Sequence, residues 1–171
     1  MFYSTTVLCL MLKKLLIMAT KNISILYLDD EKENLTSFSA NFRREFNLFV
    51  ASSIEEAYSI IESNEIHVVL SDHKMPHITG VEFFETLSKT HPTIVRILLT
   101  GCSDLEIAVE SVNRGQIFKF LYKPMDIGLV KKTMILAYDK YMADKRNQQE
   151  VIDLIETNEK LEFMLRQKLI S

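Results

Sequence analysis

The segment 23–28, with the sequence ISILYL, is a short apolar run that ends at the acidic pair Asp29-Asp30. An apolar run of this length, bounded by polar residues, is typical of a β-strand buried on both faces. Four more segments of this kind follow along the chain, at residues 48–50, 66–70, 94–99 and 116–121. The sequence therefore predicts five buried strands.

Between these segments, apolar residues recur at the three- and four-residue spacing of amphipathic helices. The positions that mark the five helices are Leu35, Phe38 and Phe42; Ile54, Ala57, Ile60 and Ile61; Val81, Phe84 and Leu87; Leu105, Ala108, Val109 and Val112; and the residues from about Asp126 onward. Ser53 with Glu56 forms a capping box, and Asp104 is an expected N-cap. Strands that alternate with helices predict a parallel, doubly wound α/β sheet covered on both faces.

In an open parallel sheet, the functional crevice lies beyond the carboxyl ends of the strands. The polar residues that follow the predicted strands are Asp29, Asp30, Asp72, Thr100 and Lys123. Three carboxylates, a hydroxyl and an ammonium group are therefore expected to meet at one edge of the sheet.

Three neighbouring carboxylates repel one another and need a cation to remain ionised together. A small set of oxygen ligands is typical of Mg²⁺, which keeps part of its water shell. Lys123 adds a second positive charge, and Thr100 offers a hydroxyl to an anionic oxygen. This set favours in-line phosphoryl transfer to one of the aspartates. The chain lacks a glycine-rich ATP-binding loop, so we do not expect an enzyme in its own right.

Four separated pieces of sequence resemble a known family. They are LYLDDE (26–31), LSDHKMP (70–76), LLTG (98–101) and FLYKP (120–124). In content, order and spacing they resemble the receiver (CheY-like) domain of two-component response regulators, over residues 22–141. The resemblance implies a flavodoxin-like sheet of five strands with five helices, and a function in phosphorelay signal transduction.

The resemblance also implies a role for each site residue. Asp72 stands at the position of the phosphoacceptor. Asp30 corresponds to the direct Mg²⁺ ligand, and Asp29 to its acidic neighbour, which acts largely through water. The backbone carbonyl of Lys74 would be a further protein ligand, and Lys123 would contact the phosphoryl group.

A switch is implied as well. Phosphorylation would draw the Thr100 hydroxyl inward and let Phe120 fill the space behind it. The surface formed by the fourth helix, the fifth strand and the fifth helix would then change. The implied partners are a sensor histidine kinase or a phosphotransfer protein, and a downstream protein or an output domain missing from this chain.

Plainer interpretations exist for single residues. Asp29-Asp30 alone is equally typical of a solvated turn, and Phe120 alone is typical of a core residue.

Two other classes of protein fit the sequence poorly. A haloacid-dehalogenase-type phosphatase needs a second acid where this chain has Lys74, and a flavodoxin-like nucleotide binder needs a small-residue loop where it has Asp29-Asp30.

The composition describes one domain with extensions. The 171 residues carry 20 basic and 23 acidic side chains, for a net charge of −3. No basic excess is present to displace counterions from phosphates, so we expect no direct binding to nucleic acid. Two cysteines, Cys9 and Cys102, cannot build a disulfide framework, which favours a reducing, cytoplasmic location.

Residues 1–21 are predicted to be an apolar N-terminal extension. Lys13 and Lys14 interrupt the apolar run after about a dozen residues, short of the ~20 that a membrane-spanning helix needs. We therefore expect no membrane span.

Residues 142–171 are predicted to be a helical tail. Residues at coiled-coil spacing are Val151, Leu154, Asn158, Leu161 and Leu165. This pattern favours a coiled coil that forms a homodimer, or a signal-transmitting linker, over an amphipathic helix packed on its own domain. The tail is too short to hold an output domain.

An alternative function for the whole chain is a constitutive dimerisation module whose phosphorylation pocket is vestigial.

Overall fold

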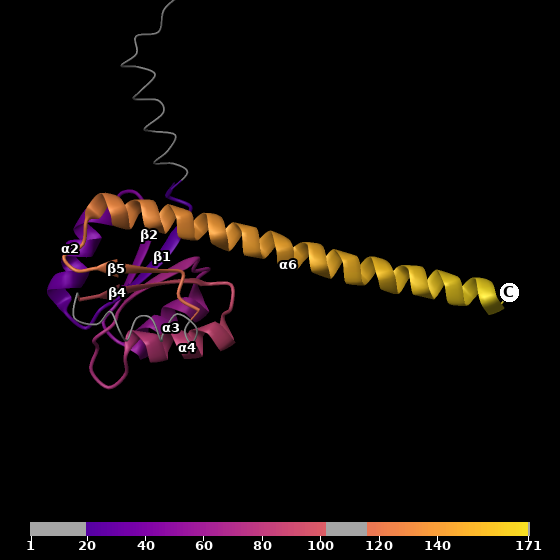
Figure 1. Cartoon of the computed structure of the whole chain (residues 1–171), viewed down its shortest axis with the longest axis horizontal. Helices are drawn as coiled ribbons and strands as arrows, with labels where there is room; N and C mark the ends of the chain where they lie inside the picture. The colour runs from indigo at the N-terminus through magenta and orange to yellow at the C-terminus, as the bar shows by residue number, and fades with distance from the viewer. Residues whose placement is uncertain (1–19, 102–115, 171) are drawn as a thin grey trace, which may run out of the picture.

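The computed structural model describes residues 20–101 and 116–170 (Figure 1). Its centre is a parallel sheet of five strands in the order β2-β1-β3-β4-β5. The strands are β1 (Ser24–Leu28), β2 (Asn47–Ala51), β3 (Val68–Asp72), β4 (Val95–Thr100) and β5 (Lys119–Tyr122). The strand order reverses at β1, as in a doubly wound sheet, so the predicted α/β fold is confirmed.

Helices cover both faces of the sheet. Those within the described residues are α2 (Lys32–Phe42), α3 (Ile54–Ser63), α4 (Gly80–Thr90) and α6 (Ile127–Ile170). Phe38 of α2 and Met134 of α6 belong to the core on one face. Ala57 of α3 and Phe84 of α4 belong to the core on the other, and Figure 1 shows α6 and the α3–α4 pair on opposite sides. The helix predicted after Asp104 falls on residues 102–115, outside the described residues.

Two strands extend further than predicted. The sequence predicts that the third strand ends at Leu70 and the fourth at Leu99, but β3 runs to Asp72 and β4 to Thr100. Asp72 pairs with Leu99, and Thr100 pairs with Tyr122, in the parallel ladders. Because backbone groups make the ladder, a polar side chain at its end does not stop it. The site residues are thus fixed by the sheet itself.

The predicted start of the fifth strand at residue 116 is wrong by three residues, because β5 begins at Lys119. Gln116 has a φ of 46°, a left-handed backbone conformation that a strand does not accommodate. Its carbonyl instead accepts a hydrogen bond from Nε of Arg96 at 3.4 Å. A turn therefore occupies the expected first part of the strand.

Helix α6 is a single helix of 44 residues, which confirms the predicted helical extension. Where it leaves the sheet, Tyr141 and Lys145 both donate to Oε1 of Glu65, at 3.1 Å and 2.7 Å. The ring of His67 lies 4.7 Å from that of Tyr141, and burial lowers the pKa of His67 below its ordinary value. These four residues fasten α6 to the domain at the amino-terminal edge of the sheet.

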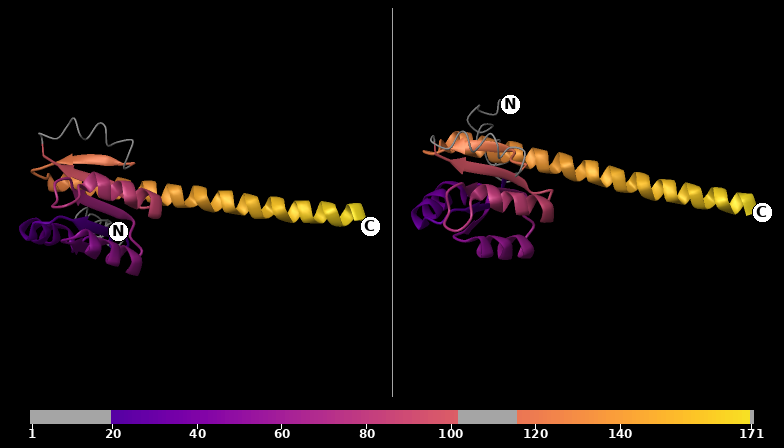
Figure 2. Two further views of the ribbon diagram at one scale, coloured as in Figure 1. Left: turned by 90° about the horizontal axis from the view of Figure 1, so that it is seen from below. Right: turned by 60° about the horizontal axis from the view of Figure 1, so that its bottom comes forward.

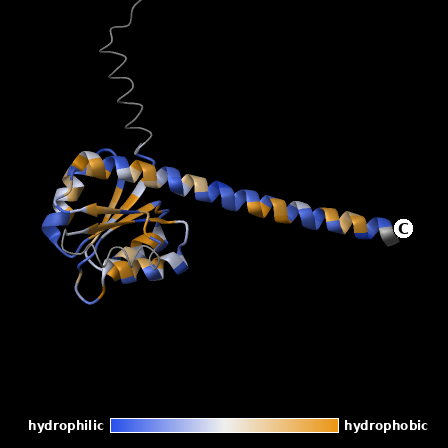
Figure 3. Ribbon diagram, in the orientation of Figure 1, coloured by the Kyte–Doolittle hydropathy of each residue, from blue (hydrophilic) through white to orange (hydrophobic). Residues whose placement is uncertain are grey.

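Beyond this attachment, α6 extends away from the domain (Figure 2). The side chains of residues 147–168 are all exposed. Hydrophobic and hydrophilic segments alternate along this part of the helix (Figure 3). Over residues 20–101 and 116–170, the helices include none with the length and apolar character needed to span a membrane.

Helix α4 begins at Gly80, directly against the end of β3. A Cβ atom at Gly80 would lie 2.2 Å from the backbone oxygen of Asp72 and 2.8 Å from Cδ1 of Leu98. The helix start is fixed by a capping box, in which Thr79 and Glu82 each accept from the other's backbone N–H. The missing side chain therefore lets α4 approach the strand that carries Asp72.

We predict that Gly80→Ala lowers the free energy of unfolding by roughly 1–3 kcal/mol, because the backbone must move to admit the methyl group. Urea denaturation measures the change. Gly128→Ala is the matched control, since its Cβ would meet only the Asp126 side chain, at 3.3 Å. Helix propensity should make that variant more stable by up to about 1 kcal/mol. Equal effects of the two substitutions would contradict the role given to Gly80.

Candidate functional site

Three carboxylates meet at the carboxyl-terminal edge of the sheet. Asp29 and Asp30 follow β1, and Asp72 is the last residue of the neighbouring β3. One carboxylate oxygen from each residue lies within 4.8 Å of the other two. Asp29 is 0% exposed and Asp72 8%, whereas Asp30 is open to solvent. The cluster therefore has two buried members and one that faces outward.

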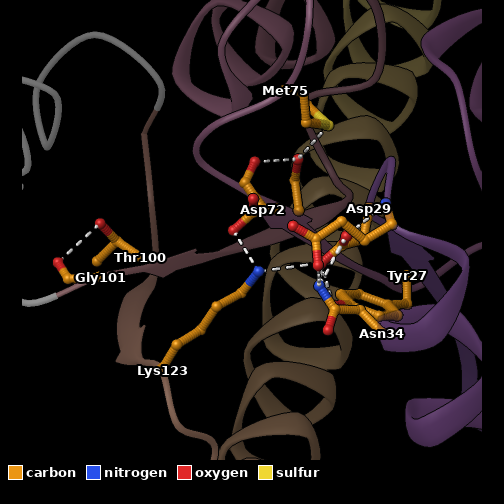
Figure 4. A network of polar contacts seen from close by, with 10 residues as sticks. Tyr27, Asp29, Asn34, Asp72, Met75, Thr100, Gly101 and Lys123 are labelled. Carbon is orange, nitrogen blue, oxygen red and sulfur yellow. Dashed lines mark hydrogen bonds and ion pairs between the residues drawn. The ribbon is translucent and has the colours of Figure 1, made fainter.

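Lys123 brings a positive charge into this cluster from the end of β5. Its Nζ lies 2.8 Å from Oδ1 of Asp72 and 3.1 Å from Oδ2 of Asp29 (Figure 4). Its backbone N–H donates to the carbonyl of Thr100 at 2.9 Å, which fixes the residue beside β4. Burial acts to lower the pKa of Lys123, but the hydrogen bonds and charges of Asp72 and Asp29 outweigh it and raise the pKa. The ammonium is therefore held in its charged form between them.

Asp29 is the most heavily hydrogen-bonded member. Its Oδ2 accepts from the hydroxyl of Tyr27 at 2.5 Å, and its Oδ1 accepts from the backbone N–H of Glu31 at 2.9 Å. The amide of Asn34 donates to both oxygens. Burial acts to raise the pKa of Asp29, but these hydrogen bonds and Lys123 lower it. The buried carboxylate is therefore kept ionised.

Sequence reasoning missed Tyr27 and Asn34. A signal for Tyr27 existed, because residues two apart in a strand share a face, so Tyr27 lies on the same side of β1 as Asp29. Burial and the hydrogen bond to Asp29 both raise the pKa of Tyr27, so its phenol keeps its proton. For Asn34, a polar residue in the first turns of a helix carries no comparable signal.

The remaining predicted residues lie around the cluster. Thr100 ends β4 with its side chain buried, and its hydroxyl donates to the carbonyl of Gly101 at 3.3 Å. Figure 4 shows that hydroxyl directed away from Asp72 and Lys123. Phe120 is half-buried on β5 and packs against the core beneath α3 and α4. Lys74 lies in the loop that follows β3, with an exposed side chain.

The donor set fits a hard divalent cation. Three carboxylates face one ammonium, so the site carries an excess of negative charge. The three acids offer only carboxylate oxygens, and the exposed position of Asp30 leaves a side from which an ion with its water shell can approach. Among the described residues, the cluster includes no thiol or imidazole donor that would favour a softer metal, so the arrangement suits Mg²⁺.

We predict that Asp30→Asn raises the free energy of unfolding by roughly 1 kcal/mol in EDTA, because it removes one of three mutually repelling charges. It should also reduce the stabilisation that added Mg²⁺ gives the unsubstituted protein. Chemical denaturation with and without Mg²⁺ measures both effects. Glu33→Gln changes the net charge equally in the first turn of α2, where an acid is favourable, and should be slightly destabilising. A loss of stability in Asp30→Asn would refute the predicted repulsion.

A family model described as the response regulator receiver domain matches residues 25–134. The chain is 33% identical over 107 residues to the hydrogenase transcriptional regulatory protein HoxA of Cupriavidus necator, a match that covers 63% of this chain and 22% of HoxA. It is 28% identical over 118 residues to the transcriptional regulatory protein ZraR of Escherichia coli, covering 68% of this chain and 26% of ZraR. The chain thus spans about a quarter of the length of the curated relatives it matches.

Solved structures are similar to this chain over most of its length. An adenylate cyclase from Rhodopirellula baltica aligns with a TM-score of 0.72 at 29% identity, covering 76% of this chain and 97% of that one. A response regulator receiver domain protein from Clostridium thermocellum aligns with a TM-score of 0.66 at 28% identity, covering 71% and 98%.

Proposed function

This chain belongs to the response regulator receiver family, and from that premise we propose that it accepts a phosphoryl group on Asp72 in a phosphorelay. The observation that carries the proposal is the ammonium of Lys123, placed 2.8 Å from Asp72 and 3.1 Å from Asp29. A fixed positive charge beside a nearly buried carboxylate is what an incoming phosphoryl group needs. The donor would be a sensor histidine kinase or a phosphotransfer protein.

In the transfer, a carboxylate oxygen of Asp72 forms a bond to phosphorus while the bond from phosphorus to the donor's imidazole nitrogen breaks. The nitrogen keeps the electron pair of that bond. The product is an acyl phosphate on Asp72. The ammonium of Lys123 offsets the negative charge on the phosphoryl oxygens as they arrive.

The carboxylates of Asp30 and Asp72, with the backbone carbonyl of Lys74, would hold Mg²⁺, and Asp29 would act on it through water. A bound Mg²⁺ would neutralise charge on the phosphoryl oxygens. Asp29 and Asp72 are already assembled by the sheet, so little reorganisation is needed to accept the ion.

Phosphorylation would then change the surface near β4 and β5. A phosphoryl group adds about −1.5 to −2 charge and three acceptor oxygens. Thr100 would turn its hydroxyl from the Gly101 carbonyl toward these oxygens, and Phe120 would move into the space that Thr100 leaves. Phe120 is half-buried, so it lies at the margin of the core where such a movement is least costly.

The output of the signal would be delivered by another protein or by a linked output domain. The curated relatives are transcriptional regulatory proteins of which this chain spans about a quarter. We infer a cytoplasmic protein that acts by phosphorylation-dependent contacts and performs no catalysis on a further substrate.

The exposed part of α6 supports a second proposal, a homodimer through a parallel coiled coil. Residues at coiled-coil spacing are strongly exposed: Val151 55%, Leu154 63%, Leu161 49% and Leu165 61%. Asn158 occupies a seam position of the same class as Val151 and Leu165. A single asparagine at such a position pairs with its counterpart and sets a two-stranded register. A second copy of α6 would cover this stripe.

We predict that Asp72→Asn abolishes phosphorylation by a small phosphodonor with Mg²⁺. The amide cannot act as the nucleophile, whereas the surrounding charges remain. Intact-mass spectrometry or Phos-tag electrophoresis measures the modification. Asp139→Asn, an exposed acid on α6, is the control and should be phosphorylated normally. Equal modification of Asp72→Asn and the unsubstituted protein would reject Asp72 as the acceptor.

We predict that Leu161→Glu raises the dimer dissociation constant roughly 100-fold or more, because each helix loses a buried leucine and places a charge in the seam. Ile152→Glu is the matched control: Ile152 is 48% exposed and Leu161 49%, but Ile152 lies outside the seam. Analytical ultracentrifugation with and without beryllofluoride measures the oligomeric state. A protein that stays monomeric in both conditions would rule out the coiled coil, and a dimer only with beryllofluoride would rule out constitutive dimerisation.

A further inference from the structure

The carboxylate of Asp29 receives more hydrogen bonds than it has well-placed acceptor positions. The donors are the hydroxyl of Tyr27, the backbone N–H of Glu31, the amide of Asn34 and the ammonium of Lys123. The amide reaches Oδ1 at 3.0 Å and Oδ2 at 3.1 Å, which makes five contacts in total. An ionised carboxylate offers about four lone-pair sites. No site on Asp29 is left for a direct bond to a cation while these donors stay in place.

Asp30 contrasts with its neighbour. Asp30 is exposed, whereas the Asp29 side chain is 0% exposed. The two adjacent acids therefore have different tasks. Asp30 can bind an ion directly, and Asp29 supplies a fixed negative charge behind it.

Tyr27 is the most deeply buried of the three side-chain donors. The residue is 0% exposed within β1, and its ring stacks on that of Phe38 with centroids 4.1 Å apart. Strand and stacked ring leave the phenol little freedom, so the position of its oxygen is set by the core. A buried hydroxyl without a partner is costly, and the bond to Asp29 at 2.5 Å satisfies this one.

Tyr27 and Lys123 share one oxygen, Oδ2 of Asp29. The hydroxyl lies 2.5 Å from it and the ammonium 3.1 Å, whereas the ammonium lies only 2.8 Å from Asp72. A carboxylate oxygen that already accepts a strong hydrogen bond attracts a second donor less. The hydroxyl therefore leaves Lys123 nearer to the carboxylate that would be phosphorylated.

We propose that Tyr27 is a positioning residue for phosphoryl transfer, which locks Asp29 as an anionic anchor and keeps Lys123 directed at Asp72. The inference rests on the proposed phosphoacceptor function. It adds a residue from inside the core to a site otherwise built from strand ends. Such outer partners of a metal site commonly change metal affinity or activity by about 10–100-fold when they are removed.

The test is Tyr27→Phe, which keeps the stacked ring and deletes only the hydroxyl. Calorimetric titration with Mg²⁺ alone should give a dissociation constant about tenfold higher than in the unsubstituted protein. At saturating Mg²⁺, phosphorylation by a small phosphodonor should remain slower, because Lys123 is then drawn toward Asp29. If deleting the donor merely made Asp29 a stronger anion, Mg²⁺ would bind more tightly. Tighter or unchanged binding, with an unchanged rate, would overturn the inference.

Tyr58→Phe is the matched control. The hydroxyl of Tyr58 is buried with no hydrogen-bond partner among the described residues, so its loss removes a phenol oxygen without touching the site. Mg²⁺ affinity and phosphorylation rate should stay within twofold of the unsubstituted protein. Equal losses in both variants would mean that any buried hydroxyl matters, and would overturn the specific role of Tyr27.

A second measurement covers the case in which Tyr27→Phe does not fold. In an NMR titration of the unsubstituted protein labelled with [ζ-¹³C]tyrosine, the chemical shift of the Tyr27 carbon should change as Mg²⁺ binds. Its midpoint should be the Mg²⁺ concentration at which half of the protein has bound the ion. The chemical shift of the Tyr58 carbon should not change. A Tyr27 chemical shift that does not change when Mg²⁺ is added would overturn the inference. If the unsubstituted protein neither binds Mg²⁺ nor becomes phosphorylated, the proposed function fails as well. If it does both while Tyr27→Phe behaves identically, only the inference about Tyr27 fails.

Discussion

The ammonium of Lys123 holds three distant parts of the chain at one point. It joins the end of β5 to the ends of β3 and β1, through Asp72 at 2.8 Å and Asp29 at 3.1 Å. Taking charges out of water costs free energy that such a pair only partly recovers, so this contact adds little net stability. What it provides is a positive charge fixed between two carboxylates at close range, a site that a cation and a phosphoryl group can both use.

The features that could be predicted from the sequence are those that depend only on the order of the short apolar segments along the chain. Five such segments alternating with helical patterns gave the parallel sheet, and a parallel sheet gathers its strand ends at one edge. That rule alone brought Asp29, Asp72 and Lys123 together, because each comes at the end of its own strand. The exact strand ends were less well predicted: Asp72 and Thr100 are the last residues of β3 and β4 and do not follow these strands, since ladder hydrogen bonds do not depend on side-chain polarity.

Features that join segments by side-chain contact were not predictable in the same way. The strand pattern places Tyr27 on the same face of β1 as Asp29, but Tyr27 counted as one more apolar strand residue, because spacing alone does not show that its hydroxyl reaches Asp29. The contact needs the ring packed on Phe38, which lies in the following helix. The attachment of α6 is similar: Glu65 and Lys145 are 80 residues apart, and only the fold brings them together.

Helix α6 connects the two opposite edges of the sheet. The helix begins at Ile127, four residues after Lys123 at the carboxyl-terminal edge, and is fastened at the opposite edge by Glu65, Tyr141 and Lys145. Under the proposed function, phosphorylation would shift the end of β5 and with it the start of α6. Because α6 contains no proline that would kink it, the helix could transmit this shift along its length. The exposed residues beyond the attachment would then change direction with it. Under the proposed function, the helix would be the element that carries the state of the site to a partner copy or an output domain.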